Sequence, residues 1–137
     1  YRRDLEASER LAAEFPGVPE YRHRVGRAAY AVGSAVAEGP RPADALPLYD
    51  RAVELLAGPV AANPAVRLNR DALRNAYWGR AELLSAASRH ADAAAAWRGM
   101  VDLIPADQGD HAVFRASLAE ALLAAGDRAA AAAEARK

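Results

Sequence analysis

The amino-acid sequence predicts an all-α protein built as an α-solenoid of antiparallel helical hairpins, with about seven helices. Three observations carry this prediction. Apolar and small residues recur at helical spacing through most of the 137 residues, and no stretch alternates as a β-strand does. Short segments separate the helical stretches, and all but one of them bear proline or glycine. A pattern of small and large residues also repeats along the chain, which is typical of repeat architectures.

The separators have the chemistry that stops one helix and starts the next. Proline has no backbone N–H and fixes φ, whereas glycine favours the turn that follows a helix. They are Pro16 to Pro19, Gly39 to Pro42, Asn63-Pro64, Ser88-Arg89, Pro105 to Asp107 and Gly126-Asp127. The expected helices are residues 1–14, 19–38, 42–62, 64–87, 89–104, 109–125 and 127–136. Because the connections are short, successive helices are expected to pack antiparallel.

These helices are expected to form a single domain over residues 1–137, a length that buries a core without disulfides or metals. The first helix is expected to be the second, or trailing, helix of a hairpin. The complete hairpins are expected at residues 19–62, 64–104 and 109–137. The chain begins at Tyr1 and not at a methionine, so we expect it to be a piece of a longer protein.

The repeat is clearest in the trailing helices, where three copies can be overlaid. An alanine opens each copy, and an aromatic residue follows it four positions later in the first two copies. The matched residues are Ala45, Tyr49 and Ala52 in the first copy, Ala93, Trp97 and Met100 in the second, and Ala131 and Ala135 in the third. Helices approach closely where small side chains meet, and an aromatic ring fills the gap beside them. Trp97 is therefore expected in the core.

The spacing Ala93-x3-Trp97 and the closing Pro105 resemble the tetratricopeptide repeat. The resemblance implies a right-handed superhelix in which the first, or leading, helix of each hairpin lines a concave side. Some features depart from the pattern. The hairpins are unequal in length, with the first trailing helix prolonged through the segment LLAGPVAANP, and Met100 replaces a small residue. Arg80 and Arg115 stand where the pattern has an apolar side chain.

Three long segments also resemble the repeat tails of large bacterial serine/threonine protein kinases. They are YRRDLEASERLAAEFPGVPEYRHRVGRAAYAVG, LRNAYWGRAELLSAASRHADAAAAW and AEALLAAGDRAAAAAEA. The resemblance implies a bacterial signalling protein as the parent. It implies no kinase chemistry in this chain, which has no glycine-rich phosphate loop and no HRD or DFG sequence.

Composition narrows the expected partners and compartment. The 18 basic and 18 acidic residues cancel, so no overall charge attracts nucleic acid or an acidic membrane. No apolar run approaches the roughly 20 residues of a membrane span. The absence of cysteine fits a reducing compartment, and a cytoplasmic location is expected. We therefore expect neither membrane nor nucleic acid as a partner.

The sequence predicts no catalytic residues, metal or cofactor, and hence no enzyme. The three histidines, His23, His90 and His111, lack the spacing of a zinc-binding helix. Asp107 and Asp110 lie around the start of an expected helix, where an aspartate is more simply a cap than a cation ligand. No serine lies in a repeated or convergent arrangement with a base.

The repeat register places a set of side chains on or near the expected concave side. Trp78 is the expected anchor, because its neighbour Tyr77 takes the core side and adjacent helical residues point about 100° apart. The predicted binding residues are Tyr30, Ser34, Trp78, Glu82, Ser85, Glu120 and Leu123. The alternative for Trp78 is a position in a contact between repeats.

The function expected from this shape is a protein-interaction scaffold that binds a peptide or helix in its concave groove. One alternative is a self-association module that forms a homo-oligomer through the terminal helices, residues 1–14 and 127–137. A weaker alternative is nucleic-acid binding through a run of arginines. These are Arg22, Arg24, Arg27, Arg67, Arg70, Arg74 and Arg80, which the interspersed acidic residues are expected to pair.

Some tetratricopeptide domains grip a terminal carboxylate with Lys, Asn and Arg on successive leading helices. Here the matching positions hold Tyr30 and Ser34, then Gly79, then Val113 and Ser117. The sequence therefore predicts that this carboxylate clamp is missing.

Overall fold

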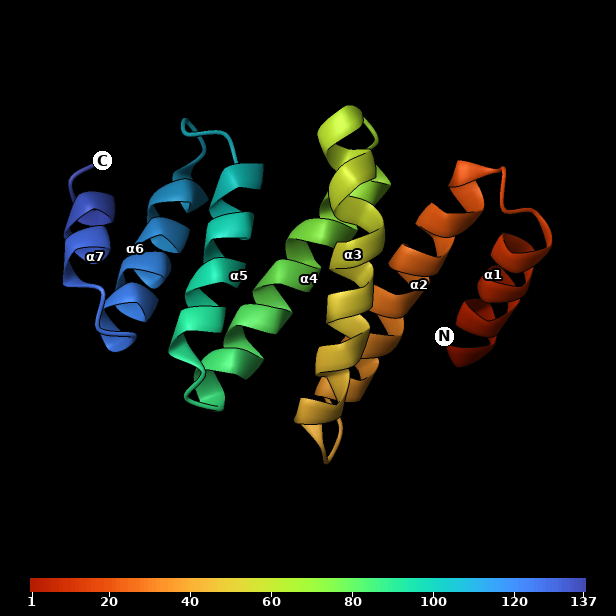
Figure 1. Ribbon diagram of the computed structural model, residues 1–137, viewed down its shortest axis with the longest axis horizontal. Helices are drawn as coiled ribbons and strands as arrows, with labels where there is room; N and C mark the ends of the chain where they lie inside the picture. Colours follow the sequence, from red (N-terminus) through yellow and green to blue (C-terminus); the bar gives the residue numbers. More distant parts are fainter. The chain divides into compact units, whose positions relative to one another are not determined.

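The computed structural model describes all 137 residues and is all-α, as predicted, with no β-strand (Figure 1). Seven α-helices follow one another, and a short 3-10 helix lies between the second and the third. The helices are α1 (Arg2–Glu14), α2 (Pro19–Ala37), α3 (Leu46–Ala62), α4 (Arg67–Ala86), α5 (His90–Leu103), α6 (Gly109–Ala124) and α7 (Arg128–Ala135), and the 3-10 helix is Pro42–Ala45. Every predicted helix is present, with its ends close to the expected residues.

Two starts differ from the prediction for local reasons. Residues 42–62 were expected as one helix, but the α-helix begins at Leu46 after the 3-10 turn. Pro47 has no N–H to donate to the carbonyl four residues earlier, so the α-helical ladder cannot extend back through it. The fourth helix starts at Arg67 and not at residue 64, because Asn63 forms a turn in which its side chain accepts from the Ala65 N–H at 3.3 Å.

The chain divides into two compact units, residues Tyr1–Gly79 and Arg80–Lys137, with the boundary inside α4. The first unit holds α1, α2, α3 and the first part of α4. The second holds the end of α4 with α5, α6 and α7. The single domain, the grouping into hairpins and the solenoid remain predictions.

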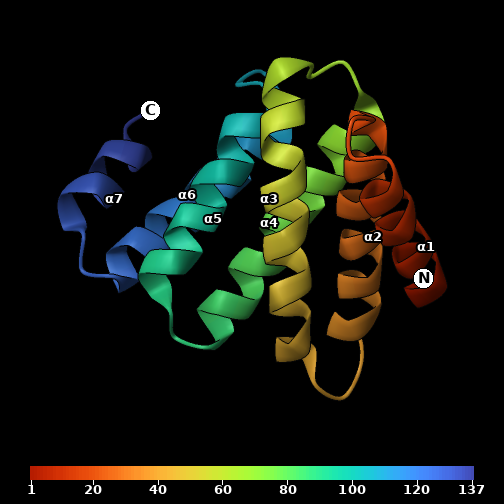
Figure 2. The same cartoon turned by 45° about the vertical axis from the view of Figure 1, so that its right-hand side comes forward.

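In the first unit, α2 packs against α1 on one side and against α3 on the other (Figures 1 and 2). The interior is made of small and branched side chains at helical spacing. The most buried are Val25, Ala29, Val32, Ala45, Tyr49, Ala52, Leu56, Val60, Leu73 and Ala76. As expected, α3 continues through Pro59 to Ala62, and it buries Val60 beyond the proline.

Glycines let the side chains of α3 approach the backbones of α2 and α4. A Cβ built on Gly26 would lie 2.7 Å from Cγ of Leu56, and one on Gly33 would lie 3.0 Å from the ring of Tyr49. A Cβ on Gly79 of α4 would lie 2.6 Å from the same ring. Tyr49 therefore packs between two glycines, and it fixes the contact of α3 with both helices.

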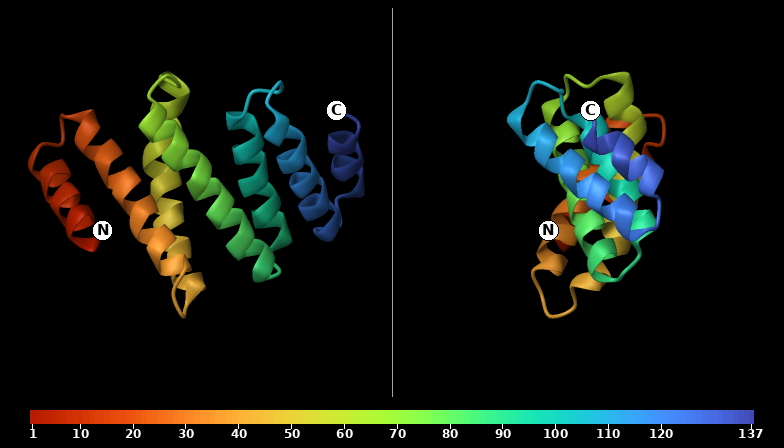
Figure 3. Two further views of the ribbon diagram at one scale, coloured as in Figure 1. Left: turned by 180° about the vertical axis from the view of Figure 1, so that it is seen from behind. Right: turned by 90° about the vertical axis from the view of Figure 1, so that its left-hand side faces the viewer.

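In the second unit, α6 packs against α5 on one side and α7 on the other, as Figure 3 shows from behind. Trp97 is 8% exposed and stacks on Phe114 of α6 at 6.0 Å between ring centroids. This confirms the core position predicted for Trp97. Gly126 supplies the positive φ of 88° in the turn before α7, and the Asp127 side chain caps that helix by accepting from the Ala130 N–H at 3.0 Å.

Candidate functional site

Three of the predicted binding residues lie in the first unit. Tyr30 and Ser34 lie one turn apart on α2 and are half-buried, and the Tyr30 ring stacks on buried Tyr49 at 6.4 Å between centroids. Trp78 lies on α4 with 42% of its surface exposed. Trp78 is thus a large apolar side chain that water reaches.

The other four predicted residues lie in the second unit. Glu82 of α4 is exposed and Ser85 is half-buried. On α6, Glu120 is exposed and Leu123, three residues later on the same face, is 57% exposed. Each of the seven side chains therefore has accessible surface, and their union in one concave groove remains a prediction.

The same face of α2 carries a network of charged and polar groups ahead of Tyr30. Glu20, His23 and Arg27 follow at helical spacing, and Arg27 donates to Glu20 at 2.6 Å and to Asn69 of α4. His23 Nδ1 lies 3.4 Å from Glu20. The hydrogen bond from Arg27 holds the pKa of Glu20 below its ordinary value, with a smaller contribution from His23. The network ties the start of α4 to α2.

A hollow of about 410 Å³ opens over α2, between α1 and α3, and is here called the α2 hollow. It is lined by Glu9, Ala12, Ala13, Pro16, Arg22, Val25, Arg51, Glu54 and Leu55. It is continuous with a neighbouring hollow of about 320 Å³, which shares Pro16, Arg22, Glu54 and Leu55. Its lining combines an apolar floor with charged groups from three helices.

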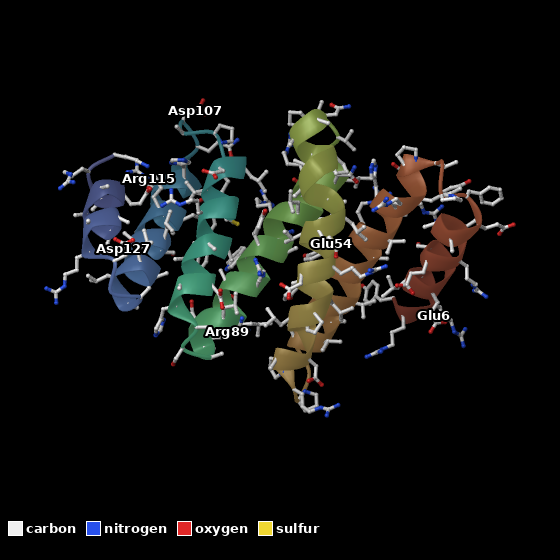
Figure 4. All side chains as sticks on the ribbon, viewed as in Figure 1. Glu6, Glu54, Arg89, Asp107, Arg115 and Asp127 are labelled. Carbon is white, nitrogen blue, oxygen red and sulfur yellow. The ribbon has the colours of Figure 1, made fainter.

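The charged groups of the α2 hollow differ in their pairing. Glu9 of α1 and Arg51 of α3 form an ion pair at 3.8 Å that joins the two helices. Arg22 and Glu54 line both parts of the hollow and have no ion pair or side-chain hydrogen bond, and Figure 4 shows Glu54 on α3. The hollow therefore offers a ligand one free cation and one free carboxylate.

Sequence reasoning missed this hollow. In the sequence, Arg22 is one of a run of arginines, and no pattern marks Glu54 or Leu55. The lining residues come from helices up to 46 positions apart, from Glu9 to Leu55, and no short motif joins them. Unpaired charges beside an apolar floor can be recognised only once the helices are packed.

In the second unit, three cationic side chains surround the buried carboxylate of Glu134 on α7, and these four residues are here called the Glu134 cluster. Lys137 Nζ lies 2.8 Å from Glu134 and Arg98 Nη1 of α5 lies 3.0 Å from it. Arg115 of α6 donates to the Glu134 backbone carbonyl, and its Nε lies 3.8 Å from the carboxylate. The Lys137 and Arg98 hydrogen bonds lower the pKa of Glu134, although burial acts in the opposite direction.

Arg115 is one of the two arginines at which the sequence departs from the repeat pattern, and the structure accounts for it. Its side chain is 17% exposed, and Figure 4 shows it on α6. An arginine there reaches α7, whereas an apolar side chain would lose the bonds to Glu134. That departure was the one sequence signal for the cluster.

No three His, Asp or Glu side chains lie together in a group that could hold a metal ion. His90 begins α5 and His111 lies in the first turn of α6, while Asp107 lies in the loop before α6 and Asp110 in its first turn. No helix has the length and apolar character needed to cross a membrane. The predicted absence of an enzyme, a metal and a cofactor remains a prediction.

Several arginines of the run considered for nucleic acid are bound by the protein itself. Arg27 pairs with Glu20, and Arg67 pairs with Asp71 at 3.3 Å. Arg70 donates to the Pro64 carbonyl at 2.8 Å. These contacts are those of a salt-bridged helix surface.

Comparison with known proteins identifies no relative: no protein-family model, curated protein or solved structure matches this chain.

Proposed function

We propose that this chain is a protein-interaction scaffold that binds a peptide or helix, as part of a multidomain cytoplasmic signalling protein. Two kinds of surface support the proposal. One is the leading-helix face that carries Trp78. The other is the α2 hollow, formed over α2 by α1 and α3. Both are made of side chains suited to binding a partner and not to making or breaking covalent bonds.

The observation that carries the proposal is the exposure of Trp78. A soluble protein leaves an indole 42% exposed on a packed helix at a cost in hydration free energy, and such a residue is a frequent interface anchor. Its neighbours on α4, Ala72, Leu73 and Ala76, are buried and hold the helix in place. A partner that covers the indole would gain apolar burial without first having to order the helix.

The α2 hollow is a second surface for the same function. Its floor of Val25 and Leu55 suits one apolar side chain of a peptide. Free Arg22 and Glu54 suit an acidic and a basic residue on either side of that anchor, because opposite charges across an interface set register and specificity. The preferred ligand of this surface is a short segment with both charges around an apolar residue.

A peptide selection followed by fluorescence tests the proposal. Peptides are selected from a displayed library on the purified chain and then titrated while tryptophan emission is recorded. Trp97 is buried already, so a shift of the emission to shorter wavelength reports Trp78. Trp78→Phe should abolish the shift. A charge-swapped Arg22→Glu, Glu54→Arg variant shows whether the α2 hollow holds the peptide instead. Failure to enrich any peptide that binds saturably would contradict the proposal.

Self-association is the alternative function, and the surface of α7 favours it. Ala129, Ala132 and Ala133 on this helix are exposed, so the backbone is accessible to close approach by another helix. Light scattering across a concentration series separates the two functions. A mass that rises to that of a dimer, with no selected peptide, would support self-association.

A further inference from the structure

The Glu134 cluster holds more positive charge than its one buried carboxylate balances. Glu134 is 4% exposed and is approached by Arg98, Arg115 and Lys137. Arg98 and Lys137 reach the carboxylate at hydrogen-bond distance, whereas Arg115 does not. Three cations therefore share one carboxylate, and the charge of Arg115 is poorly compensated.

Arg115 shows this shortfall directly. Its Nε is buried and has no hydrogen-bond partner, and the nearest carboxylate oxygen, on Glu134, is 3.8 Å away. Its hydrogen bond from Nη2 goes to the neutral backbone carbonyl of Glu134. A cation that loses water is costly unless an anion pairs with it closely. An additional anion beside the guanidinium would supply that pairing.

A hollow of about 420 Å³ gives such an anion access to the cluster. Arg98, Arg115 and Lys137 all line it, and His111 of α6 adds an imidazole. We propose that this hollow binds a phosphate group, free or carried by a partner. Guanidinium N–H groups match phosphate oxygens in pairs, and a lysine ammonium adds a mobile point charge.

Besides the paired carboxylate of Glu134, one exposed group of the hollow opposes the phosphate and supplies the sharpest test. Asp102 also lines the hollow, four residues after Arg98 on α5. Arg98 and Asp102 form no ion pair with each other, because Arg98 extends to Glu134. The exposed Asp102 carboxylate therefore repels an incoming anion. Removal of this carboxylate should strengthen phosphate binding. If the cluster only holds α7 in place, removal of the Asp102 carboxylate should not change the affinity for phosphate.

The experiment is an NMR titration of the isotope-labelled chain with inorganic phosphate at constant ionic strength. Saturable shifts are expected at Arg98, His111 and Arg115. Asp102→Asn should bind phosphate roughly threefold to tenfold more tightly, the effect of one nearby exposed charge. The matched control is Asp92→Asn, which removes the same charge ten residues earlier on α5, about 15 Å away along the helix. This control should bind as the unaltered chain does.

Two further arms complete the test. Arg115→Lys keeps the charge and loses the guanidinium fork, so it should bind more weakly while circular dichroism shows the helices intact. A phosphoserine peptide that binds more tightly than inorganic phosphate would identify a partner as the source, and equal affinity would identify free phosphate. Linear, unsaturated shifts, or equal affinity of the Asp102 and Asp92 variants, would overturn the proposal. The peptide-binding function does not depend on this result, since inorganic phosphate does not probe Trp78.

Discussion

Gly79 of α4 lies directly against the ring of Tyr49 on α3. A Cβ at Gly79 would be 2.6 Å from the ring atoms Cε2 and Cζ and 2.8 Å from the hydroxyl oxygen. Real Cβ atoms do not come so close, and Tyr49 has little room to move because it is 4% exposed and also touches Gly33. The absence of a side chain at Gly79 thus decides how closely α4 approaches α3.

Gly79→Ala is expected to destabilise the first unit. Forced overpacking costs about 1–3 kcal/mol, and the better helix propensity of alanine returns about 1 kcal/mol or less. We expect a net loss of roughly 1–2 kcal/mol in the free energy of unfolding, measured by urea denaturation. Gly109→Ala is the control, because a Cβ there meets nothing within 4 Å, and this variant should be neutral or slightly stabilised. A stabilised Gly79→Ala variant would contradict the close contact.

Ala93→Leu should also overpack a helix contact. Ala93 is 0% exposed in α5, so three added carbons have no free space and should cost about 1–3 kcal/mol. Ala95→Leu, two residues later on an exposed face of the same helix, should leave the melting temperature nearly unchanged. Equal melting temperatures for the two variants would show that Ala93 is not at a close contact.

The Glu134 cluster predicts an acid-sensitive contribution to stability. Because the pKa of Glu134 in the folded chain lies below its ordinary value of 4.5, the stabilisation is full above that value. It is lost as the pH falls through the lower folded pKa. Glu134→Gln should cost about 1–3 kcal/mol at pH 7, since hydrogen bonds to a charged group are lost.

Unfolding by urea between pH 7 and pH 3 checks this prediction. The difference between the unaltered chain and Glu134→Gln should shrink as the solution becomes more acidic than 4.5. Glu120→Gln, at an exposed position on α6, should show no such convergence. A difference that stays constant with pH would mean that the ionised form of Glu134 is not what stabilises the fold.

The helices were predictable because their signals are local. Proline and glycine mark most of their ends, and the helical spacing of small and large residues places Trp97 and Ala93 in the core. The one missed element, the 3-10 turn at Pro42–Ala45, depends on Pro47 interrupting the hydrogen-bond ladder. That proline stood in the sequence, but its effect was hidden by the continuous apolar pattern.

The sites were less predictable because their residues meet only in the folded chain. Arg98 and Glu134 are 36 positions apart, and Arg27 and Asn69 are 42 apart. Helical spacing indicates which face a side chain occupies, and it placed Trp78 on an exposed surface. It does not indicate which charges will find partners, so it could not distinguish the paired Arg27 from the free Arg22.

The missing carboxylate clamp gives a prediction about ligands. Tyr30, Ser34 and Gly79 supply no cation where a clamp needs one. Peptides with an acidic, chaperone-type carboxyl terminus should bind no better than scrambled versions in fluorescence polarisation. Amidation of the terminus should leave the affinity unchanged. A clear preference for the free carboxylate would contradict the prediction that the leading helices lack a carboxylate clamp.

The role of Trp78 as the anchor for a bound peptide is tested most directly by Trp78→Ala, titrated by calorimetry with a selected peptide. Truncation of such an anchor costs about 2 kcal/mol or more, so we expect affinity to fall roughly thirtyfold. Phe15→Ala removes an aromatic side chain of similar exposure, 45% against 42%, from the loop after α1, and it should leave affinity unchanged. An intact helical spectrum with thirtyfold weaker binding for Trp78→Ala alone is the predicted result. Equal affinity of the folded Trp78→Ala variant and the unaltered chain would contradict it.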